Sequence, residues 1–101
     1  MKANFDQVLN DLEGKPIPKN RDNDPTPVTL KSACLIALTT PMQEDQQLTG
    51  EQSFKRLELA RRINKGGEQE LDPDEAVTIR NRAAKVLILE IAGQVYELLK
   101  G

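Results

Sequence analysis

Hydrophobic positions along the chain recur mainly at helical spacing, and three segments carry this pattern. The first segment is predicted to begin after Thr29, which can cap a helix N-terminus, and to stop near Thr39 because Pro41 follows. Its apolar residues recur at i, i+3, i+4, i+7 and i+8, the spacing that places side chains on one face of a helix. These residues are Leu30, Ala33, Cys34, Ala37 and Leu38.

The second helical segment has start and stop signals of its own. Thr49 is followed three positions later by Gln52, so each side chain can bond the other residue's backbone N–H in a capping box. Residues 64–67 (NKGG) should end this helix, since glycine readily adopts the left-handed backbone that follows a last turn. The apolar positions between these signals are Phe54, Leu57, Ala60 and Ile63.

The last segment is predicted as one long helix from Pro73 to about Leu99. Asp72 can cap it, and Glu75 completes a capping-box pattern. Drawn at about 100° per residue, its apolar residues span roughly 200°, about twice the width that one core-facing stripe needs. The main apolar side holds Val77, Ala84, Leu87, Ile88, Ile91, Val95 and Leu98, and Leu89, Ala92, Tyr96 and Leu99 widen it.

Two explanations fit this wide apolar arc. The helix could be the central element of the fold, covered on adjacent flanks by the two other helices, because a three-helix domain needs one member with two apolar faces. Alternatively, part of the arc could be a surface for a protein partner or a second copy of the chain. The residues of that possible protein interface are Leu89, Ala92, Tyr96 and Leu99.

The N-terminal quarter is open to two interpretations. Over residues 5–18, the residues Phe5, Val8, Leu9 and Leu12 fit a helical stripe, and Gly14 could end this short helix. The stretch LEGKPI also fits a turn between two short strands, the second confined to a sheet edge by its prolines. Residues 15–27 are loop-like and residues 66–71 could add a brief extended piece.

Together these elements predict a mainly α fold. We expect a compact three-helix domain with a long central C-terminal helix, preceded by an N-terminal arm or, as an α+β variant, by a β-hairpin. A chain of 101 residues is the size of one domain, with residues 1–27 as arm or hairpin plus polar loop and residues 28–101 as helical core.

The composition offers little for catalysis or ligand binding. Histidine, the commonest general base and metal ligand near neutral pH, does not occur, and Cys34 lies on an apolar stripe with no activating partner in the sequence. Acidic residues gather between positions 68 and 75 but lack the spacing of a calcium loop. We therefore expect no enzyme activity, no metal, no cofactor and no small-molecule substrate.

The N-terminal sequence MKANFDQVLN lacks the apolar stretch of a signal peptide, and no run of about 18 apolar residues occurs. A single cysteine cannot form an internal disulfide, which suits a reducing compartment. The expected location is the cytoplasm, without membrane association. The net charge of −2 gives no general attraction to polyanions.

One basic concentration supports an alternative function in nucleic-acid binding. Against it, Glu51 with Lys55 and Glu58 with Arg62 are favourable i, i+4 pairs, as on a solvated helix face. No aromatic residues that could stack on bases lie among these basic residues. We expect Arg80 to pair with an acidic residue of the second helix such as Glu58. The alternative nucleic-acid contacts are Arg61, Arg62, Arg80, Arg82 and Lys85.

The order of a GKPI turn, VTLKSACLIAL, LTGEQSFKRLELARRI, ELDPDE and GQVYELL resembles small uncharacterised proteins encoded in tailed-phage and prophage genomes. This resemblance implies a phage accessory protein in the host-cell cytoplasm and favours the strand–turn–strand start; it assigns no functional residues. The function we expect is non-enzymatic binding of a protein, either a second copy, an assembly factor or a host factor. The alternative is a nucleic-acid-binding regulator with a basic helical face.

Overall fold

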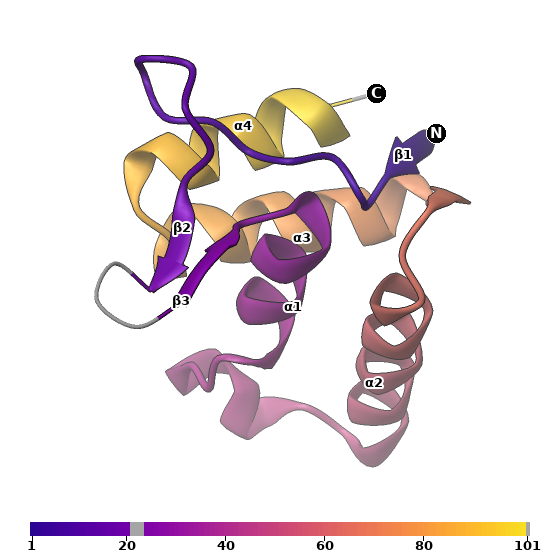
Figure 1. Cartoon of the computed structure of the whole chain (residues 1–101). Helices are drawn as coiled ribbons and strands as arrows, with labels where there is room; N and C mark the ends of the chain where they lie inside the picture. Colours follow the sequence, from indigo (N-terminus) through magenta and orange to yellow (C-terminus); the bar gives the residue numbers. More distant parts are fainter. Residues whose placement is uncertain (21–23, 101) are drawn as a thin grey trace.

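The computed structural model describes residues 1–20 and 24–100, with the backbone alone at positions 19, 20, 24 and 25. Figure 1 shows a mainly helical arrangement, which confirms the predicted fold class. Its α-helices are α1 (Leu30–Thr39), α2 (Gly50–Asn64), α3 (Pro73–Val86) and α4 (Leu89–Leu99), and a short 3-10 helix, η1 (Gln43–Gln47), lies between the first two. The strands are β1 (Lys2–Asn4), β2 (Pro18–Asn20), β3 (Asp24–Pro27) and β4 (Glu68–Glu70).

The predicted helix starts at Thr29 and Thr49 are confirmed. Gln52 N–H donates to the Thr49 hydroxyl at 3.1 Å, and the Gln52 side chain accepts from Thr49 N–H at 3.0 Å, so both halves of a capping box form. Thr29 and Ser32 exchange the same two contacts at the start of α1. α1 ends at Thr39, two residues before Pro41, as predicted.

The predicted single C-terminal helix is wrong in one respect, since it is divided into α3 and α4. Leu87 and Ile88 leave the helical conformation, with ψ angles of 153° and 157°, and α4 then runs back along α3 (Figure 1). A helical wheel drawn across this break assigns residues to the wrong faces. Of the residues on the predicted core side, Val77, Ala84, Ile88 and Leu98 are exposed, while Val95 is buried as predicted and Leu87 and Ile91 are half-buried. The other buried residues of these two helices are Ala76, Ile79, Arg82, Ala83 and Leu99.

The central helix is α1, and the prediction that the C-terminal helix is central is also wrong. α1 contacts α2, α3 and α4, whereas α3 and α4 pack mainly on α1 and on each other. All five apolar residues of its predicted stripe are buried. Because α1 is short and carries small side chains, including two alanines and Cys34, three helices can approach it closely.

The N-terminal segment is extended and turned, so the strand–turn–strand alternative is right and a helix at residues 5–14 is wrong. Phe5 N–H donates to Gly67 O and Leu9 N–H to Val28 O, both at 2.9 Å, so these amides bond distant segments instead of a helical turn. Gly14, with φ of +84°, lies in the turn between Asn10 and Pro16, which form an antiparallel bridge.

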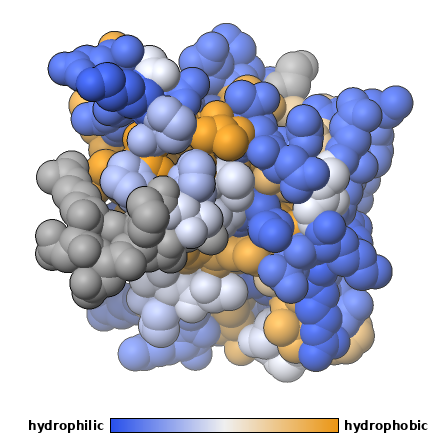
Figure 2. Space-filling view, in the orientation of Figure 1, coloured by the Kyte–Doolittle hydropathy of each residue, from blue (hydrophilic) through white to orange (hydrophobic). Residues whose placement is uncertain are grey.

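Two small antiparallel sheets connect this segment to the helices. β2 pairs with β3 as a hairpin, and β1 pairs with β4, which confirms the extended piece expected at residues 66–71. Phe5 and Leu9 are buried in the same core as α1, so the arm is part of the hydrophobic core. In the view of Figure 2, hydrophilic residues cover most of the surface and hydrophobic ones appear as separate patches.

Candidate protein-interaction surface

The hairpin of α3 and α4 exposes one apolar face. Val77, Arg80 and Ala84 lie at i, i+3 and i+7 on α3, and Leu89 and Tyr96 lie seven residues apart on α4, so each set shares a side of its helix. The Arg80 guanidinium lies 5.1 Å from the centre of the Tyr96 ring, which joins the two sides. We call this surface the α3–α4 face; it comprises Val77, Arg80, Ala84, Ile88, Leu89, Ala92, Gly93 and Tyr96.

Arg80 holds Tyr96 in place through a cation–π contact. Such a contact contributes about 0.5–1 kcal/mol at an exposed site and more where water is excluded. The Nε atom of Arg80 is buried, and within the described part of the chain it has no hydrogen-bond partner. The predicted pairing of Arg80 with Glu58 is wrong, because Glu58 binds Arg61 instead.

Of the four residues predicted as a possible protein interface, three lie on the α3–α4 face. Leu89 is 87% exposed and Tyr96 is 56% exposed, while Ala92 is half-buried between them. Leu99 is only 1% exposed and belongs to the core, so its inclusion is wrong. It points inward because the break at Leu87 and Ile88 sets the rotation of α4 independently of α3.

Sequence reasoning missed part of this face. Val77, Ala84 and Ile88 were placed on the core side, although all three are exposed. A glycine within a helical sequence pattern could have drawn attention to Gly93. Gly93 lies in the middle of α4, its φ is not positive, and a Cβ added there would meet nothing within 4 Å. An exposed mid-helix glycine weakens a helix by about 0.5–1 kcal/mol relative to alanine, and nothing within the described chain requires one here.

The five residues of the nucleic-acid alternative do not form one exposed basic face. Arg82 is 2% exposed, which contradicts its placement on a binding face, and Arg80 lies against Tyr96. The i, i+4 pair of Lys55 with Glu51 is confirmed at 3.4 Å. The remaining three basic residues each form an ion pair: Arg61 with Glu58, Arg62 with Glu75 and Lys85 with Glu44.

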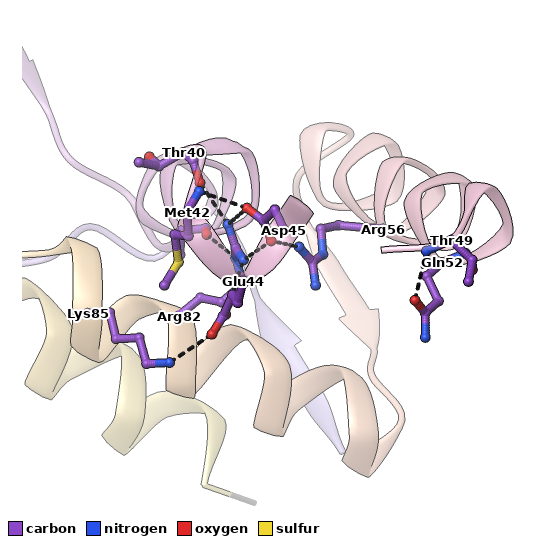
Figure 3. Close-up of polar contacts among 10 residues, drawn as sticks. Thr40, Met42, Glu44, Asp45, Thr49, Gln52, Arg56, Arg82 and Lys85 are labelled. Atoms are coloured by element: carbon purple, nitrogen blue, oxygen red, sulfur yellow. Dashed lines mark hydrogen bonds and ion pairs between the residues drawn. The ribbon is translucent and has the colours of Figure 1, made fainter. Parts of the chain in front are cut away.

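Arg82 instead fastens α3 to the end of α1 (Figure 3). Its Nε donates to Ala37 O at 2.6 Å, and one terminal nitrogen donates to Thr40 O at 2.7 Å, which satisfies carbonyls that the end of α1 leaves without helical partners. The same guanidinium binds both carboxylate oxygens of Asp45 at 2.8 and 3.1 Å. Sequence reasoning could not find this contact, because its partners lie 37 to 45 residues away.

Asp45 is the point where η1, α2 and α3 meet. Arg56 of α2 donates to its Oδ1 at 2.6 Å, and Met42 N–H donates to its Oδ2 at 2.9 Å. The hydrogen bond from Arg82, followed by those from Arg56 and Met42, lowers the pKa of Asp45 to about 2. The carboxylate therefore stays charged at neutral pH and holds η1, α2 and α3 together.

The other chemical candidates have structural roles. Cys34 is buried in α1, and burial raises the pKa of its thiol to about 12, which keeps it protonated and unreactive. Glu75 accepts a hydrogen bond from Asp72 N–H and pairs with Arg62. Within the described chain no three histidine, cysteine or acidic side chains come together as a metal ion would require.

A cleft of about 590 Å³ separates α2 from the first turns of α3. Its walls carry both signs of charge, from Lys55 and Arg62 on one helix to Asp72 and Asp74 on the other, and Phe54 is exposed at its margin. Because both signs of charge line it, the cleft has no single charge or apolar character that would select a ligand. The α3–α4 face is the more distinctive surface.

Among the helices described, none is both long enough and apolar enough to cross a bilayer. Comparison of the chain with known protein families, curated proteins and solved structures gives no match.

Proposed function

We propose that this protein acts without catalysis, by binding another protein through its α3–α4 face. The observation that carries the proposal is the exposure of Leu89 and Tyr96, two turns apart on the same side of α4, together with the exposure of Val77 and Ala84 on α3. Contiguous exposed apolar surface of this kind is typical of protein interfaces.

The energetics of the face suit protein binding. Removing a leucine side chain from water contributes about 1.5–3 kcal/mol, and tyrosine and arginine are the residue types that most often dominate binding energy at interfaces. Tyr96 is held by Arg80, so a partner would meet a ring whose position is already largely set. Charged residues such as Glu90 and Glu97 border the apolar centre, as in the polar rim of an interface.

The basic residues of the chain do not favour binding of a polyanion. Three of the basic residues considered for nucleic-acid contact are engaged in ion pairs, and one is buried. Phosphate binding depends on several free cations along one face. The sequence also carries more acidic than basic residues.

The cellular setting we propose is the cytoplasm, and the phage-like order of sequence segments suggests a phage or prophage accessory protein acting in its host. In that setting the partner could be a second copy, an assembly factor or a host factor. The chain's small size and lack of histidine support a binding role over an enzymatic one.

Photo-crosslinking tests this function directly. A benzophenone amino acid is placed at position 89 in cells that produce the protein, and a matched variant carries it at position 51, because Glu51 is 79% exposed but lies on α2. We expect covalent protein adducts from position 89 and not from position 51. Absence of adducts at position 89, or equal adducts at both positions, would contradict the proposal, and the adduct mass reports the partner.

A further inference from the structure

We infer that the protein bound by the α3–α4 face is a second copy of this chain, with α4 of one copy crossing α4 of the other at Ala92 and Gly93. This inference rests on the proposed function and specifies its partner. It follows from three observations. Nothing within the described chain requires the glycine in the middle of α4, the order of side chains along α4 is self-complementary, and the whole chain exposes more surface than a monomer of its size is expected to.

Gly93 indicates close approach by another backbone. The glycine lies in the middle of an eleven-residue helix, next to Ala92, and open space surrounds the position of a missing Cβ. Small residues at a helix crossing let two backbones approach closely, which offsets the lower helix propensity of glycine only if a second helix is present. Leu89 and Tyr96 stand on either side of this flat stretch.

The order of residues along α4 matches itself about a two-fold axis. If the axis passes between Ala92 and Gly93, antiparallel α4 helices place Ala92 opposite Gly93, and Leu89 opposite Tyr96 of the second copy. Each large side chain then meets one large side chain, and each small residue meets a small one. The apolar spacing is therefore suited to an isologous contact.

The exposed area agrees with a missing partner. The chain has 6690 Å² of accessible surface, whereas a monomeric protein of 11.3 kDa is expected to expose about 5,700 Å². This surplus of about 1,000 Å², taken over the whole chain, is similar to the roughly 800 Å² that each partner buries in a standard interface.

Sedimentation velocity of the purified full chain, from about 1 μM to about 1 mM, tests this inference. We expect the weight-average mass to rise from 11.3 kDa toward twice that value. Gly93→Leu and Leu89→Ser should each weaken dimerisation at least tenfold, because one blocks the crossing and the other removes an anchor. Phe54→Ser changes a residue that is 60% exposed on α2 and should leave the dimer unchanged.

A mass of 11.3 kDa at every concentration, or a dimer unaffected by Gly93→Leu, would overturn the inference. In either case, crosslinks from position 89 to a different protein would leave the proposed function standing, and absence of all crosslinks would remove both.

Discussion

The side-chain amide of Gln94 hydrogen-bonds in both directions to the backbone of Asn10, 84 residues earlier in the chain. Its Oε1 accepts from Asn10 N–H at 3.1 Å, and its Nε2 donates to Asn10 O at 2.6 Å. This pair attaches one side of α4 to the N-terminal arm. Leu89 and Tyr96 lie on the exposed side of α4, away from this attachment.

Replacing Gln94 should therefore loosen the arm more than it unfolds the protein. Gln94→Ala removes these two exposed hydrogen bonds and a third from Nε2 to Glu90 O, and we expect a loss of about 1 kcal/mol in the free energy of unfolding. Amide hydrogen exchange at Asn10 should accelerate several-fold, while exchange in the buried turns of α1 changes only with global stability. Unchanged exchange at Asn10 would show that Gln94 does not hold the arm.

Arg82 should be the most sensitive charged residue for stability. Arg82→Met would leave the carbonyls of Ala37 and Thr40 without their donors, and we expect a loss of about 2–4 kcal/mol, measured by urea unfolding. Arg61→Met provides the matched control, because Arg61 pairs with Glu58 in water and such pairs contribute about 0–1 kcal/mol. Equal effects of the two changes would contradict the role given to Arg82.

Asp45 makes stability depend on acid pH. Its pKa is about 2 in the folded chain and 3.8 without these contacts, so the folded state favours the charged form. The stabilisation is complete above about pH 4 and should be lost as the pH falls through the folded value near 2. Urea midpoints of the natural chain and of Asp45→Asn should converge over this interval, and a constant difference between them would contradict the assignment.

Two leucines ten residues apart on α4 should contribute very differently to the free energy of unfolding. Leu99→Ala opens a cavity in the core and should cost about 2–4 kcal/mol in the free energy of unfolding. Leu89→Ala, measured at protein concentrations low enough to exclude association, should change it by less than about 0.5 kcal/mol because this side chain is exposed. A large loss at Leu89 would mean that it packs within the chain.

Helix starts and stops were predictable because their signals are local. Thr49 and Gln52 are three residues apart and bond each other regardless of the rest of the fold, and Pro41 restricts only its immediate neighbours. The buried stripe of α1 was predictable for a related reason, since one uninterrupted helix keeps a single periodicity.

The break at Leu87 and Ile88 was not predictable from such signals. Neither glycine nor proline lies there, and the two residues leave the helix because α4 packs on α3 and α1 when the chain turns back. The apolar arc of roughly 200° was itself the sign of two helices with separate stripes. The burial of Arg82 was likewise hidden, because it depends on Asp45 and the end of α1 arriving from distant sequence.

Of the interface residues proposed from sequence, Leu89 and Tyr96 have the exposure that an interface would require, and Leu99 does not. The exposure of the first two could be anticipated because large apolar residues beyond the needs of a core face remain visible in the pattern. Sequence reasoning failed at Leu99 because only the fold sets the rotation of α4. The contact of Arg80 with Tyr96 could not be predicted from the sequence, because it joins two different helices.

Hydroxyl-radical footprinting in cells that produce the protein tests most directly whether the α3–α4 face is a contact surface. The oxidation of Leu89 and Tyr96 is compared between these cells and dilute purified protein, with Phe54 on α2 as an exposed internal control. We predict strong protection of Leu89 and Tyr96 in cells and none of Phe54. Equal oxidation of Leu89 and Tyr96 in both settings would contradict the proposed function.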